Sequence, residues 1–352
     1  MLGRKLLTTA ISLGATLALP AASYAQSYDA EYVFGNSLSD TGNAAELNGT
    51  NFPDPPSYHD SFTNGPVAVQ ILANDLGLNA NPSLFVTTFQ DVHNLFGGPS
   101  YTPGSNYAVA GATAAASPPQ GGIPNANLPQ QVSAYLSANA GKADPNALYT
   151  VFIGSNDVGG AALYGNPAEV TAGVTSEVQT IQALSAAGAR TFLVPNVWNI
   201  GNIPEFAQDN PSLAALATQY SQSYDAQLAT GLAGLALPQG TNLTPFDLYS
   251  YTAEILANAA SFGFTDTTDP CFTSTPFSAA ATPQCGPNGQ NVNSFIYWDT
   301  IHPTAPVQAL WAQGMLDALE GGSNPTLVSE PATLALLGAG LLGVGVLRRR
   351  RT

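Results

Sequence analysis

Three short polar clusters contain the residue types that acyl transfer requires. Ser37 stands in the run FGNSLSD, directly after a short apolar segment, and a Gly-containing turn there can expose its hydroxyl. Asn156 stands in the run GSND, and its side-chain amide can donate a hydrogen bond to a developing oxyanion. Asp299 and His302 stand together in WDTIHP. The carboxylate is near enough to orient the imidazole, which can then act as a base toward a serine hydroxyl.

Each cluster also has a purely structural interpretation. Ser, Asn and Asp are common helix caps, so Ser37 and Asn156 could each begin a helix. His302 could be a turn residue before a helix. The interpretation as a site depends on the combination, because a serine, a histidine and a carboxylate all fall at the expected ends of strands.

Strands and helices alternate along the chain. Short apolar runs predict strands at 32–34, 148–153, 190–194 and 243–248, and helical periodicity predicts helices at 67–76, 128–138, 168–187, 212–235, 252–260 and 305–319. This alternation favours a parallel sheet covered on both faces by helices, with the site at the carboxyl ends of the strands. The region 79–130 is rich in Gly, Pro and Asn, which predicts long surface loops that could shape a cleft.

Charge and composition exclude several classes of function. The 352 residues carry 8 Lys and Arg against 23 Asp and Glu, a net charge of −15. Residues 26–329 hold 2 basic and 22 acidic residues, a net of −20, which argues against nucleic acid as a partner. With 2 Cys, 3 His and no Gly-rich phosphate loop, we expect neither a metal site nor a cofactor.

Both ends of the chain look like targeting segments. Residues 1–25 have a basic start, an apolar run and small residues before a cleavage site after Ala25, which predicts a secretory signal peptide. Residues 332–347 are uncharged and are followed by four Arg. This stretch is slightly short for a membrane span, and the Arg cluster would stay cytoplasmic. We therefore expect a linker and a transiently membrane-anchoring tail over 323–352, after a globular domain over 26–322.

The middle of the chain resembles the GDSL (SGNH) family of esterases and lipases. The matching motifs are FGNSLSDTGN, NYAVAGATA, GSNDV and WDTIHPT, in the order of the family's blocks. The tail SEPATLALLGAGLLGVGVLRRRR resembles the PEP-CTERM sorting signal of Gram-negative bacteria, with Ser329 in place of the first Pro. That resemblance implies a secreted or cell-surface protein whose tail is processed by an exosortase-type enzyme.

The family resemblance implies a fold and a role for each residue. The fold would be a three-layer α/β/α, flavodoxin-like arrangement around a parallel sheet. Ser37 would be the nucleophile, His302 the general base and acid, and Asp299 its orienting partner. The oxyanion hole would comprise the Ser37 and Gly111 backbone N–H groups and the Asn156 side chain. Asn36 stands where the family usually has Asp, and we expect activity to survive this change.

These features predict a secreted serine ester hydrolase that acts on a lipid, a short-chain ester or an acetylated glycan. The alternatives are a deacetylase of extracellular polysaccharide and a non-catalytic matrix or adhesion protein on the same fold. Cys271 and Cys285 are expected to form a disulfide in a secreted protein, although two free thiols remain the alternative.

Overall fold

The computed structural model describes residues 27–48, 52–53, 56–85, 104–115, 126–273, 285 and 291–321. The predicted signal peptide and the predicted sorting tail lie outside these ranges. Of the helices within the described ranges, none is both long and apolar enough to cross a bilayer.

Four parallel strands form the central sheet in the order β1-β2-β3-β4. Their bounds are β1 Glu31–Gly35, β2 Leu148–Phe152, β3 Thr191–Pro195 and β4 Asn242–Phe246. Every residue of β2 and β3 is buried. Helices cover both faces of the sheet, which explains why these two strands read as continuous apolar runs without alternation.

A further extended segment, residues 104–109, lies along the free edge of β1. Tyr107 N donates to Val33 O (2.7 Å) and Val109 N donates to Gly35 O (3.2 Å), and Asn106 forms a parallel bridge with Val33. Counting this segment as a strand gives the spatial order 2-1-3-4-5, which is the flavodoxin-like order. The prediction of surface loops is wrong here, because residues 106–110 are buried and their backbone groups are satisfied by β1.

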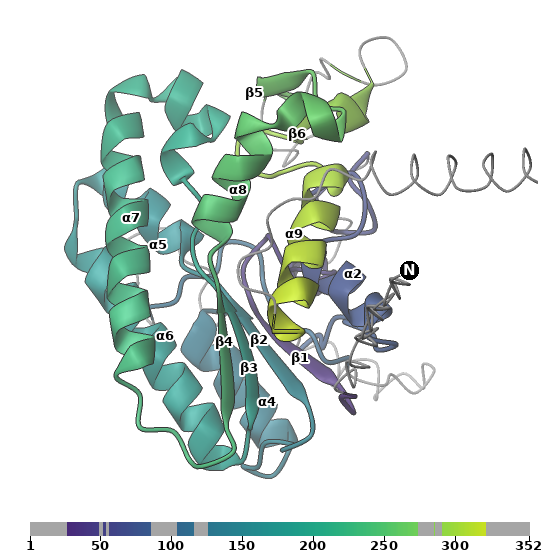
Figure 1. Cartoon of the computed structure of the whole chain (residues 1–352), viewed down its shortest axis with the longest axis vertical. Coiled ribbons are helices and arrows are strands. Elements are labelled where there is room, and N and C mark those ends of the chain that lie inside the picture. The colour runs from purple at the N-terminus through teal and green to yellow at the C-terminus, as the bar shows by residue number, and fades with distance from the viewer. Residues whose placement is uncertain are drawn as a thin grey trace, which may run out of the picture.

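Helices cover both faces of this sheet (Figure 1). On one face lie α4 (Leu128–Ala138), α5 (Ser155–Tyr164), α6 (Ala168–Ala187) and α7 (Pro211–Ala233). On the other face lie α2 (Ala68–Asp75) and α9 (Ala305–Leu319), with α8 (Leu248–Ala257) against α9. The short α1 (Asn43–Asn48) follows β1. The predicted three-layer α/β/α fold is confirmed.

A small second sheet lies beside the loop that leads to α9. It pairs β5 (Asp266–Pro270) with β6 (Phe295–Tyr297) in parallel, and the sequence analysis did not predict it. The β5 strand is polar, and β6 has three residues. Neither strand is long or apolar enough to give a periodic sequence pattern. This sheet carries the segment that ends at Asp299.

Two predicted boundaries also moved for local reasons. A strand was expected to continue to residue 248, but β4 ends at Phe246. The next helix was expected to begin at residue 252, but α8 begins at Leu248. Asp247 lies between them and caps α8 by accepting a hydrogen bond from Ser250 N (3.1 Å). A side chain that accepts an N-terminal N–H starts a helix at that point, which overrides the apolar pattern.

Candidate active site

The turn after β1 presents Ser37. Ser39 N donates to Asn36 O (3.0 Å), and Leu38 N donates to Asn36 Oδ1 (3.0 Å). Only glycine fits at position 35, the last residue of β1, because a Cβ there would lie 2.6 Å from the carbonyl oxygen of Phe152. Ser37 is 8% exposed and lines the pocket described below.

A tight loop before α9 holds His302 and Asp299 together. Asp299 Oδ1 accepts hydrogen bonds from His302 N (2.7 Å) and Ile301 N (2.8 Å). Asp299 Oδ2 lies 2.8 Å from His302 Nδ1. Trp298 N donates to His302 O (2.7 Å), which closes the loop. The carboxylate of Asp299 is fully buried, and the imidazole ring is the ionisable group that it contacts.

The structure brings these two segments into contact. His302 Nε2 lies 2.8 Å from Ser37 Oγ, while Nδ1 of the same ring faces the Asp299 carboxylate. A carboxylate at Nδ1 favours the tautomer with the proton on that nitrogen. Nε2 is then free to accept the serine proton, which is the arrangement a nucleophilic serine needs.

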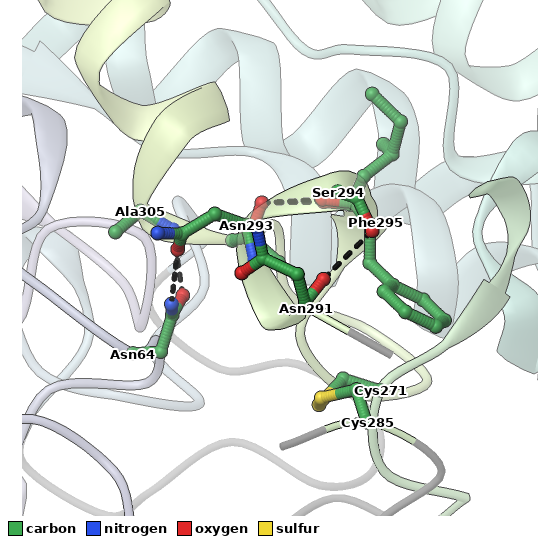
Figure 2. Close-up of a disulfide and its surroundings, with 10 residues drawn as sticks. Asn64, Cys271, Cys285, Asn291, Asn293, Ser294, Phe295 and Ala305 are labelled. Atoms are coloured by element: carbon green, nitrogen blue, oxygen red, sulfur yellow. Dashed lines mark hydrogen bonds between the residues drawn. A yellow bond between two sulfur atoms is a disulfide. The ribbon is translucent and has the colours of Figure 1, made fainter. Parts of the chain in front are cut away.

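The segment before α2 fixes the histidine loop from the other side. Thr63 Oγ1 donates to Pro303 O (3.0 Å), and Asn64 Oδ1 accepts from Ala305 N (2.8 Å) at the start of α9. Figure 2 shows this Asn64 side chain reaching Ala305. The ring of Phe62 lies 5.2 Å from the His302 ring. These contacts hold the imidazole ring in its orientation toward Ser37.

Gly111 and Asn156 line the same pocket as Ser37. Gly111 has a φ of 78°, a conformation that L residues with a side chain rarely adopt. Within the described residues, the N–H groups of Ser37 and Gly111 have no hydrogen-bond acceptor. Asn156 Nδ2 donates to Ala112 O (2.8 Å). This bond uses one of its two amide hydrogens and leaves the other for a ligand.

Asp40 connects the serine turn to the segment that carries Gly111. Its Oδ1 accepts from Gly42 N and Asn43 N, both at 2.8 Å. Its Oδ2 accepts from Ala44 N (3.1 Å) and from Ala110 N (2.7 Å). Burial raises the pKa of Asp40 to about 6, and these four backbone N–H groups oppose that rise. The carboxylate therefore fixes the position of Gly111 relative to Ser37.

Two asparagines reinforce the same connection. Asn106 Nδ2 donates to Ser39 O (2.7 Å), and Asn43 Nδ2 donates to Asn106 O (2.9 Å) and Ala108 O (2.8 Å). All of these groups are buried. A buried polar network that is satisfied in this way makes the loop rigid, so the proposed oxyanion donors are preorganised.

Asp157 performs the equivalent task for Asn156. Its carboxylate accepts from Ala114 N (2.8 Å) and Ala115 N (3.1 Å), which ties the start of α5 to the Gly111 segment. Burial raises the pKa of Asp157 to about 7, against these backbone hydrogen bonds.

The pocket at Ser37 is small and mostly apolar. Its volume is about 210 Å³. Its apolar wall includes the side chains of Leu163, Tyr164, Trp198, Ile200, Ile203, Phe206 and Ile301. Leu163 and Tyr164 are 40% and 52% exposed and form part of its mouth. Glu205 is the one acidic residue among those that line the pocket.

The disulfide lies next to the loop of Asp299. Cys271 and Cys285 are bonded, with their Cα atoms 5.1 Å apart (Figure 2). The pair packs with Phe272, Phe295 and Trp298 in a separate apolar cluster. Cys271 N donates to Tyr297 O and Phe272 N to Trp298 O, both at 3.0 Å. Cys271 and Phe272 therefore lie beside the residues that precede Asp299.

Sequence reasoning missed some residues that hold or line the site. Asp40, Asn106 and Asp157 all stand within the quoted motifs, but no role was predicted for them. Each of them is an Asp or Asn in a short run of Gly, Ser, Thr or Asn, which is also typical of turns. Glu205 lies far from any motif, and only the fold brings it to the pocket.

A serine, a histidine and an aspartate in hydrogen-bonding contact at the carboxyl ends of a parallel sheet define a class, the serine-dependent hydrolases with an α/β fold. Residues 32–315, most of the chain, match the model of the GDSL-like lipases and acylhydrolases. The chain belongs to this family, and the predicted resemblance is confirmed.

The chain is also similar to curated relatives and to solved structures over different lengths. The chain is 28% identical over 327 residues to an uncharacterized protein in the trpE–trpG intergenic region of Pseudomonas putida, which covers 88% of this chain and 51% of that protein. It is 32% identical over 199 residues to lipase 1 of Photorhabdus luminescens, and this match covers 54% of this chain and 26% of the lipase. The chain thus spans about half or less of these two relatives. An acetyl xylan esterase structure from Geobacillus stearothermophilus covers 85% of this chain and 99% of its own at 12% identity and a TM-score of 0.42.

The C-terminal segment has its own match. Residues 327–351 match the model of the PEP-CTERM protein-sorting motif, as the sequence predicted. This motif indicates a secreted or cell-surface protein of a Gram-negative bacterium.

Proposed function

We propose that the chain hydrolyses carboxylic esters through an acyl-enzyme on Ser37. One observation carries this proposal: His302 Nε2 lies 2.8 Å from Ser37 Oγ while Asp299 Oδ2 lies 2.8 Å from His302 Nδ1. The first contact is short enough for the serine proton to pass to Nε2, and the second lets the carboxylate orient the ring and stabilise its charge. The family match supports the same chemistry.

The reaction follows from these contacts. Ser37 Oγ attacks the ester carbonyl carbon as its proton passes to His302 Nε2, and Asp299 stabilises the imidazolium that forms. The tetrahedral intermediate then expels the alcohol, which takes the proton from His302. A water molecule repeats the two steps on the acyl-enzyme, giving the free acid and restoring the Ser37 hydroxyl.

Three donors are available for the oxyanion of each intermediate. They are the N–H groups of Ser37 and Gly111 and the second amide hydrogen of Asn156. The network of Asp40 and Asp157 holds them in place before substrate arrives, and such preorganised donors stabilise the transition state more than mobile ones.

The pocket favours a small ester. Its volume of about 210 Å³ is below the roughly 300–1,000 Å³ typical of sites for drug-sized ligands. Its apolar wall suits a short acyl chain or a short alcohol, and the mouth at Leu163 and Tyr164 leaves room for the remainder of a larger substrate outside. A short-chain ester is therefore the substrate class we favour.

The two ends of the chain support export and sorting. A signal peptide over 1–25 would be removed after Ala25, and an exosortase-type enzyme would process the tail at the motif matched over 327–351. Intact-mass measurement of the protein from the culture medium and from membranes tests this. A released form that still ends in the four Arg would contradict tail processing.

The proposed reaction is tested with p-nitrophenyl butyrate and the purified protein. The wild type should release p-nitrophenol, and the kcat of Ser37→Ala should be at least about 10³-fold lower. The unfolding temperature of this variant should equal that of the wild type. Ser155→Ala is a matched control, because Ser155 lines the same pocket outside the triad. Equal activity of Ser37→Ala and the wild type would refute the role of Ser37.

A further inference from the structure

Glu205 places an unneutralised carboxylate in the substrate pocket. It begins the short helical segment Glu205–Asp209 and lines the same pocket as Ser37. Its backbone N donates to Thr300 O (2.8 Å), which attaches it to the loop between Asp299 and His302. The side chain is half-buried. Its location is therefore set by the catalytic loop itself.

The Glu205 carboxylate has no hydrogen bond and no ion pair within the described part of the chain. The hydrogen bonds of Glu205 there involve its backbone N and O, with Thr300 O and Asn210 Nδ2 as partners. No Lys or Arg lines the pocket. Burial raises the pKa of Glu205, while the nearby His302 lowers it. The charges of Asp209 and Asp299 raise the Glu205 pKa further. A partly desolvated carboxylate in this position is stabilised by a cation.

The surrounding wall suits the same kind of group. Tyr164, Trp198 and Phe206 line the pocket together with Glu205. Aromatic side chains attract cations, most strongly quaternary ammonium groups, when water is excluded. An anionic group would instead meet Glu205 without any compensating cation. The pocket thus combines one negative charge with aromatic surface.

We infer that Glu205 selects substrates by charge, favouring esters whose alcohol carries a quaternary ammonium or similar cationic group over neutral esters, and neutral esters over anionic ones. This inference rests on the proposed ester hydrolysis and adds a substrate class to it. Glu205 acts on the alcohol portion through binding and takes no part in proton transfer.

Three thioesters of nearly equal size isolate the charge. They are acetylthiocholine, its uncharged carbon analogue S-(3,3-dimethylbutyl) thioacetate, and the anionic 3-(acetylthio)propanoate, each followed by the thiol released. For the wild type, kcat/KM for acetylthiocholine should exceed that for the carbon analogue by about tenfold, mainly through KM. The anionic thioester should be the poorest of the three.

The variant Glu205→Gln keeps the size of the side chain and removes its charge. The cationic-to-neutral ratio of kcat/KM should fall to about one. Asp209→Asn is the matched control, because Asp209 stands on the same segment but is exposed and does not line the pocket. It should keep the wild-type ratio and the wild-type activity toward the neutral thioester.

Two results would overturn the inference while leaving ester hydrolysis intact. One is a wild-type ratio near one. The other is a cationic-to-neutral ratio that Glu205→Gln leaves unchanged. If the wild type hydrolyses none of the thioesters and no p-nitrophenyl ester, the proposed function itself fails, and the inference fails with it.

Discussion

His302 Nε2 lies 2.8 Å from Ser37 Oγ although 265 positions separate the two residues. The serine turn ends the strand at one edge of the four-stranded sheet, while the histidine loop comes from the small β5–β6 sheet and precedes α9. The site is thus assembled from two parts of the fold, and contacts that hold either part should affect catalysis.

Asp299→Asn tests the orientation of the histidine. The amide can still accept the Ile301 and His302 backbone N–H groups through Oδ1, but its NH₂ group would face Nδ1 and favour the wrong tautomer. We expect kcat to fall by about 10³–10⁴ with the folded structure retained. Asp266→Asn is the control, because Asp266 also accepts two backbone N–H groups, from Thr268 and Asp269, without touching the histidine. A tenfold loss or less in Asp299→Asn would contradict the proposed role.

Asn156→Ala tests the third oxyanion donor. Removing one such donor typically costs about 2.7–4 kcal/mol of transition-state stabilisation. We expect kcat to fall by about 10²–10³ with little change in KM, measured with p-nitrophenyl butyrate. Asn166→Ala, just after the same helix and outside the pocket, should be near wild type. A change confined to KM would show that Asn156 binds substrate but does not stabilise the oxyanion.

Asn36 gives a more specific prediction about the serine turn. Its Oδ1 accepts from Leu38 N, while its Nδ2 is buried and has no hydrogen-bond partner among the residues that the structure describes. Asn36→Asp keeps the acceptor, so activity should stay within about tenfold of the wild type. Asn36→Ala loses the acceptor and leaves a buried N–H unsatisfied, which typically costs about 1–3 kcal/mol. Kinetics of the two variants should therefore differ, and equal loss in both would contradict the role of the Leu38 contact.

The sequence predicted the sheet, most long helices and the three residues of the proposed triad. Strands such as Leu148–Phe152 are continuous apolar runs, and α6 and α9 have long periodic patterns, so local signals sufficed. The helix α5 was not predicted, because Gly159 and Gly160 weaken its pattern, although Asn156 was considered as a possible helix start. Residues 104–109 look like a loop in sequence, because their strand-like pairing depends on the distant edge of β1. The pocket and Glu205 likewise depend on tertiary contacts that no local pattern encodes.

Buried carboxyl groups predict that stability falls as pH rises. Burial raises the pKa of Glu31 to about 8, against a hydrogen bond from Thr150. Because this folded-state pKa is above the ordinary value, the native state binds more protons than the unfolded chain between about pH 4.5 and 8. The stabilisation is complete below that interval and is lost through it. Asp157 and Asp225, with pKa values raised to about 7 and 8 by burial, act in the same direction.

Urea unfolding at pH 5.5 and pH 8.5 measures this effect. The wild type should be less stable at pH 8.5, and Glu31→Gln should lose about 3 kcal/mol less between the two pH values. Glu320→Gln, at an exposed position after α9, is the control and should follow the wild type. A wild-type stability that rises over this interval would contradict the prediction.

The disulfide should stabilise both the fold and the site. A bond closing a loop of this length typically contributes about 3 kcal/mol. The double substitution Cys271→Ser and Cys285→Ser should lower the unfolding temperature. It should also lower kcat several-fold, because Cys271 and Phe272 bond to the residues before Asp299. Calorimetry and ester hydrolysis at 25 °C check the two effects. Unchanged stability after reduction and alkylation would show that the crosslink has no structural effect.

The nucleophile itself is tested most directly by covalent labelling. A fluorophosphonate probe reacts with a serine whose proton can pass to a neighbouring base, so the mature protein should take up one probe molecule. Peptide mass spectrometry should locate that probe on Ser37, and Ser37→Ala should not be labelled. Absence of labelling in the wild type, or labelling that persists in Ser37→Ala, would contradict the assignment of Ser37 as the catalytic nucleophile.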